Sequence, residues 1–183
     1  MEKSTESEGF QNFLEEHGAD VLRFCIILTE NRERGNDLYQ DTVLTLLEKK
    51  KKFETNEKQK AYALSITIFL WKNAKKKYAV HRRLAPEESL EGMWEAAGED
   101  MIPDSSPSPE EALLKAREAE KVREAVLALP EKYRYPVELY YSADASLQEI
   151  AEVLKIPLST VKTRLRRAKL LLKDALEGEF DDR

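Results

Sequence analysis

A run of charge of one sign near the carboxyl end of the chain is the strongest sign of chemistry in this sequence. Between Val153 and Lys173 there are seven Lys or Arg residues and no Asp or Glu. In a helix, Lys162, Arg166, Lys169 and Lys173 would recur every three or four residues and share one face. A solvated helix face usually mixes both signs. The uniform positive face therefore indicates contacts with the phosphates and base edges of a nucleic acid.

The residues before this basic segment predict a short helix and a tight turn. Ser146 is a good N-cap, and Glu149 three residues later completes a capping box. The apolar positions of the short helix recur at helical spacing; they are Leu147, Ile150, Ala151 and Leu154. Pro157 disfavours a helical conformation in the residue before it and so favours a turn. Ser159 or Thr160 can then cap the next helix.

The basic helix also has an apolar stripe, which we expect to face inward. Its members follow one another at spacings of four, three and four; they are Val161, Leu165, Ala168 and Leu172. Two helices joined by a tight turn form a unit that can insert its second helix into a DNA groove. The alternative, a helical hairpin that only packs, does not explain the one-signed face.

The charge of the chain is segregated along the sequence. The 183 residues suit one or two domains and carry a net charge of −5. Basic residues concentrate in Lys72–Arg83 and Lys155–Lys173, whereas acidic residues concentrate in residues 1–41 and in Leu84–Glu120. The local field, rather than the total charge, decides what a surface attracts. The negative total therefore does not exclude a nucleic-acid-binding protein.

Most kinds of enzyme site are disfavoured by the composition. Cys25 is the lone cysteine, which excludes an intrachain disulfide and a cysteine-based metal site; its apolar neighbours favour a place in the core. His17 and His81 do not have metal-ligand spacing, and the six glycines form no phosphate-binding loop. No Ser/His/Asp or clustered carboxylate constellation is present. We expect no catalytic residue, metal, cofactor or small-molecule substrate, and hence no enzyme activity.

The sequence also predicts a protein that does not enter a membrane. The amino terminus is acidic and polar, unlike a signal peptide. The apolar run near Ala61–Trp71 is too short to span a bilayer. We therefore expect a cytoplasmic protein.

The chain is expected to be all-α, with two small helical domains joined by a flexible acidic linker. The first block, residues 7–84, predicts a first helix broken near His17–Gly18. A turn at Gly35 precedes a helix that is capped by Asn36 and runs over Asp37–Lys51, followed by a third helix over Glu57–Val80. The expected inward positions of the second helix are Leu38, Val43, Leu46 and Leu47.

Residues 85–109, rich in Pro, Ser and acid, read as the linker, and residues 110–179 form the second block. In the second block, Pro130 separates two helices, and Pro136 either follows a separate turn or bends a helix. The linker also contains residues with no assigned role, which are Met93, Trp94, Met101 and Ile102.

The string LPEKYRYPVELYYSADASLQEIAEVLKIPLSTVKTRLRRAKLLL strongly resembles region 4 of bacterial sigma factors of the extracytoplasmic-function (ECF) group. NDLYQDTVLTLLE resembles the core-binding segment of sigma region 2, and AYALSITIFLWKNAKKKYAVHRR occupies the place of its promoter-melting helix. The chain departs from the family pattern at Lys155 and Ser159, where glycine is common, and at Phe69–Lys72, where an IARN-type string is common.

This resemblance implies a set of DNA-binding residues. In region 4, the residues that would face bases of the −35 element are Lys162, Thr163, Arg166 and Arg167, and those suited to phosphates are Ser159, Thr160, Arg164 and Lys169. In region 2, the candidates for the single-stranded −10 element are Lys72, Asn73, Lys76, Tyr78, Arg82 and Arg83. Phe69 and Trp71 could stack on bases, but their spacing favours a place in the core.

The resemblance also implies the partners. Core RNA polymerase would bind through a coiled coil of its largest subunit to a surface made of Asp37, Leu38, Gln40, Asp41 and Val43. Promoter DNA and a separate anti-sigma factor complete the set, and the function would be promoter-specific initiation in response to an envelope or environmental signal. The alternative is a stand-alone helix-turn-helix regulator that binds a palindromic site as a dimer without polymerase.

Overall fold

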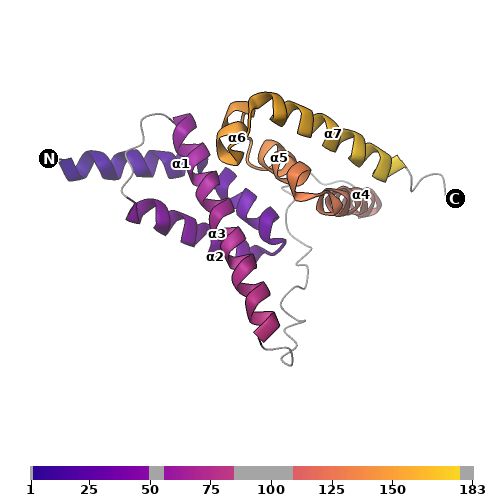
Figure 1. The fold of residues 1–183 in the computed structure, drawn as a ribbon, viewed down its shortest axis with the longest axis horizontal. Helices are drawn as coiled ribbons and strands as arrows, with labels where there is room; N and C mark the ends of the chain where they lie inside the picture. Colours follow the sequence, from indigo (N-terminus) through magenta and orange to yellow (C-terminus); the bar gives the residue numbers. More distant parts are fainter. Residues whose placement is uncertain (1, 50–55, 85–108, 178–183) are drawn as a thin grey trace. The chain divides into compact units, whose positions relative to one another are not determined.

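The structure is a computed structural model that describes the backbone of residues 2–49, 56–84 and 109–177 and the side chains of residues 9–49, 59–77 and 116–177. These residues form α-helices and no strand, which confirms the all-α prediction (Figure 1). The helices are, in chain order, α1 (Glu2–Thr29), α2 (Arg32–Glu48), α3 (Asn56–Leu84), α4 (Pro109–Ala128), α5 (Glu131–Tyr141), α6 (Leu147–Leu154) and α7 (Leu158–Glu177).

The chain divides into two compact units that do not follow the chain order. The first unit joins α1, α2 and α3 with residues 138–156, which include the end of α5 and all of α6. The second unit joins α4, α5 as far as Val137, and α7. The expected sequence bounds, 7–84, 85–109 and 110–179, stay a prediction. Linker residues 85–108, with Met93, Trp94, Met101 and Ile102, lie outside the described residues.

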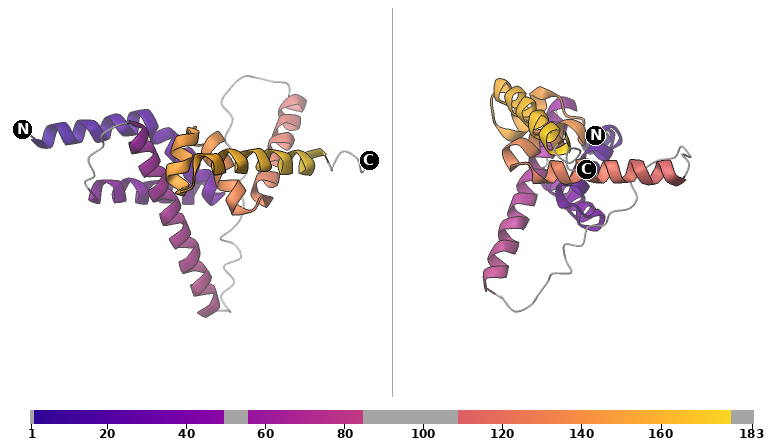
Figure 2. Two further views of the ribbon diagram at one scale, coloured as in Figure 1. Left: turned by 45° about the horizontal axis from the view of Figure 1, so that its top comes forward. Right: turned by 90° about the vertical axis from the view of Figure 1, so that its right-hand side faces the viewer.

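The core of the first unit lies where α1, α2 and α3 pack against one another (Figure 2). Phe13 and Phe24 of α1 are buried there with Leu64 of α3. On α2, Leu38 and Leu46 are buried and Val43 is half-buried, as predicted. Leu47, however, is 48% exposed, so the prediction that it faces inward is wrong. Adjacent side chains on a helix point about 100° apart. Because Leu46 points into the core, Leu47 points away from it.

α1 continues through His17 and Gly18, where the sequence predicts a break. Gly18 is buried, and a Cβ placed there would lie 3.0 Å from the hydroxyl oxygen of Tyr39 on α2. The absence of a side chain at Gly18 therefore lets α1 and α2 approach each other, and it does not end the helix.

α2 begins earlier than the predicted start at Asp37. The side chain of Asn31 is its N-cap and accepts a hydrogen bond of 3.0 Å from the backbone N–H of Arg34. This cap satisfies a free N–H of the first turn. The prediction that Asn36 caps the helix is therefore wrong.

Gly35 lies inside α2 and not in a turn. A Cβ on Gly35 would lie 2.6 Å from the Cα of Ile26 on α1, closer than atoms in contact can be. Like Gly18, Gly35 allows a close helix crossing, a property that depends on tertiary packing and not on local backbone preference.

Cys25 is a core residue, as its apolar neighbours in the sequence predict. It is fully buried, and its thiol lies in hydrogen-bonding contact with Thr42 and Thr67, whose hydroxyl oxygens are 3.3 Å apart. Burial raises the pKa of Cys25 to about 12, and the hydrogen bonds oppose this rise only in part. The thiol therefore stays protonated and unreactive at neutral pH.

The core of the second unit is formed by Leu129, Val137 and Ala168. Partly buried apolar residues pack against this core; they are Val126, Tyr133, Leu165, Leu171 and Leu172. Together with Val161, which is fully buried, this confirms the apolar stripe predicted for the basic helix. Pro136 lies inside α5, so no separate turn precedes it.

Candidate nucleic-acid interface

The short helix α6 begins as the sequence predicts. The hydroxyl of Ser146 accepts from the N–H of Glu149 (3.2 Å), and the Glu149 carboxylate accepts from the N–H of Ser146 (2.7 Å), which completes the capping box. Ile150 is fully buried and Val153 is buried. The buried face of α6 is therefore apolar apart from Glu149, whose carboxylate takes part in the capping box.

α6 ends at a residue with a left-handed backbone. Lys155 is the C-cap, with φ 53° and ψ 47°, and the N–H of Ile156 donates to the carbonyl of Ala151 (3.0 Å). This conformation is the one that glycine adopts without steric penalty and that a residue with a Cβ adopts at a cost of about 1 kcal/mol. Lys155 therefore adopts the backbone conformation expected for the glycine that is common at this position in the family, but with steric strain that glycine would not have.

α7 begins one residue before the predicted caps. The helix starts at Leu158, and the carbonyl of Pro157 accepts from the N–H groups of Thr160 (2.9 Å) and Val161 (3.1 Å). Ser159 and Thr160 therefore lie in the first turn, and the prediction that one of them caps the helix is wrong. The fixed φ of proline prepares the chain for a helical start.

The basic residues of α7 are presented to solvent. Those whose side chains are exposed, together with the neutral residues among them, are Ser159, Lys162, Thr163, Arg166, Arg167, Lys169 and Lys173. Thr160 and Arg164 are half-buried. Lys173, at the end of the run, pairs with Glu177 at 3.7 Å, and no acidic residue precedes Asp174 in the helix. The structure thus brings the predicted −35 residues together on one helix with a continuous cationic surface.

The carboxyl half of α3 is a second basic surface. In Figures 1 and 2 this half projects beyond α1 and α2. Lys72, Asn73 and Lys76, three of the residues predicted for the −10 contacts, are exposed on it. The side chains of Tyr78, Arg82 and Arg83 lie outside the described residues.

Phe69 and Trp71, which the sequence predicts for the core, have different surroundings. Trp71 is 8% exposed, and the Lys75 ammonium lies 5.9 Å from the centre of its ring. Phe69 is 56% exposed, so the prediction is wrong for this residue. The ring of Phe69 lies one helical turn from Lys72 and Asn73. An exposed aromatic ring beside cations is the combination that binds unpaired bases.

The exposed face of α2 contains acids and leucines. Asp37, Gln40 and Asp41 are exposed, as the predicted polymerase contact requires. Leu38 is buried in the core, so it packs beneath this face and is not exposed to a partner, and Val43 is half-buried. Leu44 (56% exposed) and Leu47 continue the face at helical spacing. The sequence reasoning missed these two leucines, although their spacing from Gln40 and Asp41 could have indicated them.

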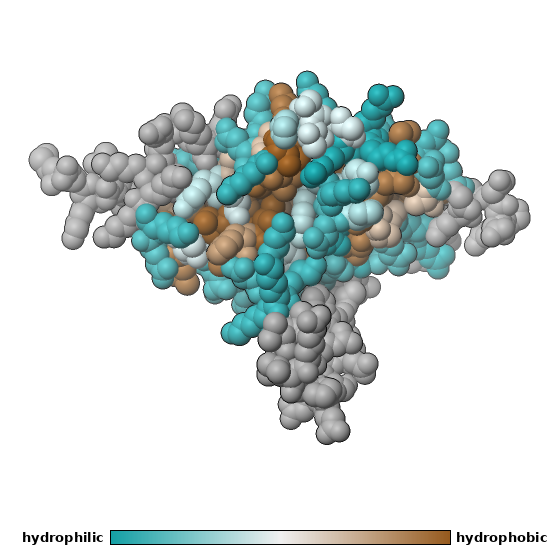
Figure 3. All heavy atoms as spheres, viewed as in Figure 1, coloured by the Kyte–Doolittle hydropathy of each residue, from teal (hydrophilic) through white to brown (hydrophobic). Residues whose placement is uncertain are grey.

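One face of the molecule is largely polar. Figure 3 shows hydrophilic residues over much of the visible face, with separate apolar patches between them. Within the described ranges, no helix is long and apolar enough to cross a membrane. The same residues contain no cluster of His, Cys, Asp or Glu that could hold a metal ion.

Comparison with protein-family models identifies both basic segments. The model of sigma-70 region 2 matches residues 13–80, and the model of sigma-70 region 4 matches residues 119–172. The first match contains α2 and α3 as far as residue 80, which is most of its basic part, and the second contains α6 and most of α7.

Individual relatives match nearly the whole chain. The ECF RNA polymerase sigma factor SigW of Bacillus subtilis (strain 168) is 25% identical over 178 residues, which cover 95% of this chain and 92% of SigW. Two solved structures share the fold, each with a TM-score of 0.63. The first is the sigma factor RpoE from Bartonella quintana in complex with the anti-sigma factor NepR (20% identity; 93% of this chain, 98% of RpoE). The second is CnrH in complex with the cytosolic domain of CnrY (15% identity; 94% of this chain, 90% of CnrH).

The two family models occur in one chain, and a relative of the same kind aligns with both of them. The chain therefore belongs to the sigma-70 family of RNA polymerase sigma factors, in its ECF group.

Proposed function

We propose that this chain is an alternative sigma factor that binds core RNA polymerase and directs it to a particular set of promoters. It acts in the cytoplasm, catalyses no reaction itself, and responds to an envelope or environmental signal. The observation that carries the proposal is the presence of three exposed surfaces in one sigma-70 chain. They are the acidic and apolar face of α2 and the basic faces of α3 and α7.

α7 suits the major groove of the −35 element. Its exposed cations are on one helix that follows a short helix and a tight turn, the arrangement in which a recognition helix contacts base edges. Arg166 and Arg167, with Lys162 and Thr163, are assigned to bases, because guanidinium groups pair bidentately with guanine. The assigned phosphate contacts, which fix register without reading sequence, are Ser159, Thr160, Arg164 and Lys169.

The carboxyl half of α3 suits the melted strand of the −10 element. Lys72, Asn73 and Lys76 follow the sugar-phosphate backbone, and the exposed ring of Phe69 stacks on an unpaired base. Base stacking on an aromatic side chain is worth about 1–3 kcal/mol and does not require a particular base. Tyr78, Arg82 and Arg83 extend this surface in the sequence.

The exposed face of α2 is assigned to the coiled coil of the largest polymerase subunit. Asp37, Gln40 and Asp41 supply hydrogen-bond acceptors, and Leu44 and Leu47 supply the apolar area that an interface core needs. We expect Gln40→Ala combined with Asp41→Ala to weaken holoenzyme assembly. Glu33→Ala, on the first turn of the same helix, is the matched control. Normal assembly of the double variant would remove this face from the proposal.

Residues 7–84 and 110–179 are proposed as the two functional domains, with residues 85–109 as the tether between them. A separate anti-sigma factor is the proposed inhibitor. The structural neighbours RpoE and CnrH were each solved in complex with a partner, NepR and CnrY respectively. These complexes support a separate protein partner for a chain of the same fold. The partner proposed for this chain covers its DNA-binding surfaces until a signal removes it.

In-vitro transcription with core polymerase on a genomic DNA library tests the function directly. The expected result is a set of transcripts that start at related promoters and that require this chain. The competing function, a stand-alone helix-turn-helix regulator, predicts a dimer that binds a palindrome without polymerase. A monomer in sedimentation that binds core polymerase would exclude the competitor. Failure to form a holoenzyme would overturn the proposal.

A further inference from the structure

The hydroxyl group of Thr163 is already engaged within α7. Thr163 Oγ1 donates to the backbone carbonyl of Ser159, one turn earlier in the helix, at 2.9 Å. A threonine in a helix can form this bond to the carbonyl four residues before it. The hydroxyl has a single proton, so while this bond is present Thr163 has no hydrogen to donate to a base. Towards a ligand its oxygen can only accept.

The methyl group of Thr163 is therefore the part of the side chain that projects from the helix. The hydroxyl and the methyl of a threonine occupy different staggered positions on Cβ. The hydroxyl takes a position that reaches back to the carbonyl of Ser159. The methyl is left in one of the two directions that long side chains take in a helix, because the third direction runs into the preceding turn. Thr163 is exposed, so its methyl is available to a ligand of the α7 face.

Thr163 lies where a recognition helix contacts bases. It is the sixth residue of α7, which begins at Leu158, and residues near the amino end of a recognition helix contact base edges. Arg166 and Arg167 follow three and four residues later and share its face. All three side chains are exposed, and no acidic residue lies between them. Because a threonine side chain is short, a base that it touches must lie next to the helix itself.

A projecting methyl group beside arginines favours thymine among the four bases. Thymine carries a C5-methyl in the major groove, and a threonine methyl can make an apolar contact with it. Guanine presents only the acceptors N7 and O6 there, and Thr163 has no proton to give them. The Thr163 oxygen can still accept from the amino group of adenine or cytosine, but it is turned toward the carbonyl of Ser159. The bond to Ser159 thus directs Thr163 toward thymine and against guanine.

We propose that Thr163 determines specificity in the −35 element by placing its methyl group against the C5-methyl of a thymine. This inference rests on the proposed sigma function and on the assignment of α7 to the −35 duplex. Arg166 and Arg167 lie roughly 5–6 Å further along α7, which corresponds to about one or two base pairs. The thymine is therefore expected beside the guanine that one of these arginines reads.

Replacement of thymine by deoxyuridine tests this contact, because it removes the C5-methyl and leaves the hydrogen-bonding groups of the base in place. The holoenzyme, formed from the complete chain and core polymerase, is titrated against promoter duplexes in which each thymine of the −35 element is replaced in turn. We expect one replacement to weaken binding about fourfold, as for one methyl group removed from an apolar contact. Replacement of thymines outside the −35 and −10 elements measures the background.

Two substitutions separate the methyl of Thr163 from its hydroxyl. Thr163→Ser removes the methyl and keeps the hydroxyl, so this variant should bind the thymine duplex and the uracil duplex equally well. Thr163→Val keeps a methyl in the same place, so it should retain the difference in affinity between the two duplexes. The loss of the oxygen acceptor in Thr163→Val changes the preference for bases with an amino group and not the response to the thymine methyl.

Two further variants serve as controls. Thr45→Ser makes the same chemical change on α2, where Thr45 Oγ1 donates to the backbone carbonyl of Asp41 (2.7 Å) in the same kind of bond. Leu170→Ala tests a competing apolar contact, because Leu170 is 45% exposed about two turns after Thr163 on α7. Both variants should retain the difference in affinity between the thymine and uracil duplexes.

The proposal is overturned if no thymine of the −35 element responds to the replacement, or if Thr163→Ser still distinguishes the two duplexes. Loss of the difference in Leu170→Ala, with Thr163→Ser unaffected, would assign the thymine contact to Leu170 instead. Each of these results is obtained with a holoenzyme that binds its promoter. They therefore differ from a failure of the proposed function, in which the unaltered chain forms no holoenzyme.

Discussion

The two basic surfaces, on α3 and on α7, differ in what lies between their charges. α7 contains no aromatic residue. Its exposed face carries cations, with the hydroxyl group of Thr163 among them. On α3, the exposed ring of Phe69 lies one turn before Lys72 and Asn73. Guanidinium and hydroxyl groups hydrogen-bond base edges in a duplex groove, whereas an aromatic ring needs an unstacked base. The comparison favours the proposed division, in which similar charge serves double-stranded DNA on α7 and a separated strand on α3.

The supports of the two surfaces differ as well. α7 covers a small core around Ala168, Leu129 and Val137, so most of its length remains available to a groove. α3 packs against α1, α2 and α6; its buried residues lie within 59–71, and residues 72–77 are exposed. The basic half of α3 is thus an extension of a packed helix, held at one end, which suits a surface that must keep its shape beside a flexible strand.

The largest effect is expected from removal of a base-reading arginine on α7. Arg166→Ala or Arg167→Ala should weaken binding of a −35 duplex by about 1–3 kcal/mol, or roughly 5- to 150-fold. Binding of a single-stranded −10 oligonucleotide should not change. Fluorescence anisotropy at one fixed salt concentration measures both affinities.

Arg123→Ala is the control for these variants, because it removes a guanidinium group from α4 instead of α7, where that group pairs with Glu120 (2.6 Å). If duplex binding fell as much in this control, total charge and not the α7 face would explain the effect. If neither α7 variant lost affinity for the duplex, the assignment of bases to this helix would be wrong.

The next largest effect concerns the ring that distinguishes α3 from α7. Phe69→Ala should slow open-complex formation on a duplex promoter, because it removes an aromatic ring on which an unpaired base can stack. We expect the free-energy barrier to open-complex formation to rise by about 1–2 kcal/mol. Phe69→Trp should retain the activity, and a template with a pre-melted −10 segment should rescue Phe69→Ala in part. Permanganate footprinting of unpaired thymines measures the open complex. Normal melting by Phe69→Ala would mean that the aromatic ring does not distinguish the function of the α3 surface from that of the α7 surface.

Salt dependence separates two kinds of contact on α7 itself. Lys169 is assigned to a phosphate, so Lys169→Ala should reduce the slope of log affinity against log salt concentration by about 1 and weaken all sequences alike. Thr163→Val changes a residue assigned to a base and should leave the slope unchanged while it alters the preferred sequence. An unchanged slope in Lys169→Ala would exclude the phosphate assignment.

The local features of α6 and α7 could be read from the sequence because they depend on neighbours in the chain. The Ser146–Glu149 capping box and the stripe of Val161 and Ala168 each involve a single helix. The same holds for the exposed cations of α7, since a one-signed face has no reason to turn inward. The one-signed face after a short helix and a tight turn indicated DNA, and the family resemblance supplied the assignment of this face to the −35 element.

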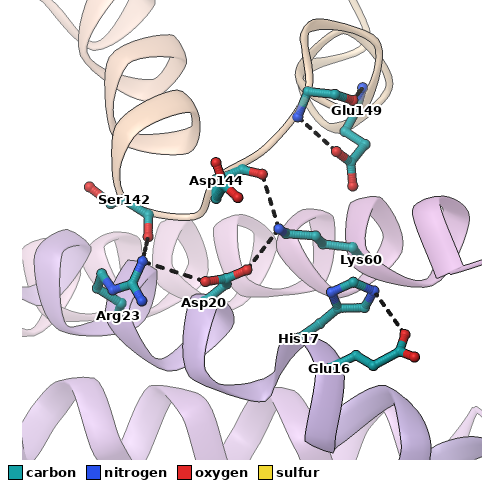
Figure 4. A network of polar contacts seen from close by, with 9 residues as sticks. Glu16, His17, Asp20, Arg23, Lys60, Ser142, Asp144 and Glu149 are labelled. Atoms are coloured by element: carbon teal, nitrogen blue, oxygen red, sulfur yellow. Dashed lines mark hydrogen bonds and ion pairs between the residues drawn. The ribbon is translucent and has the colours of Figure 1, made fainter.

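The features that could not be predicted depend on contacts between distant segments. Gly18 and Gly35 read as helix breaks, because their role is visible only when Tyr39 and Ile26 approach them. Periodicity groups Phe69 with the apolar residues of α3 but does not show how far α1 and α2 cover that helix. The hydrogen bond from Lys60 to the carbonyl of Asp144 (Figure 4) could not be foreseen for the same reason, since the two residues are 84 positions apart in the sequence.

The smallest effect is expected at the turn that joins α6 to α7, and it shows whether charge or backbone matters there. Lys155 lies in the same basic run as the α7 cations, but its left-handed backbone costs about 1 kcal/mol relative to glycine. Lys155→Gly should therefore raise the free energy of unfolding by up to about 1 kcal/mol and leave −35 binding nearly unchanged. Denaturation followed by circular dichroism measures the first quantity. Lys155→Ala removes the same charge but keeps a Cβ, so it should bring no such gain. Equal stabilisation by both variants would mean that relief of charge repulsion dominates, and a clear loss of DNA affinity in both would extend the recognition surface from α7 into the turn.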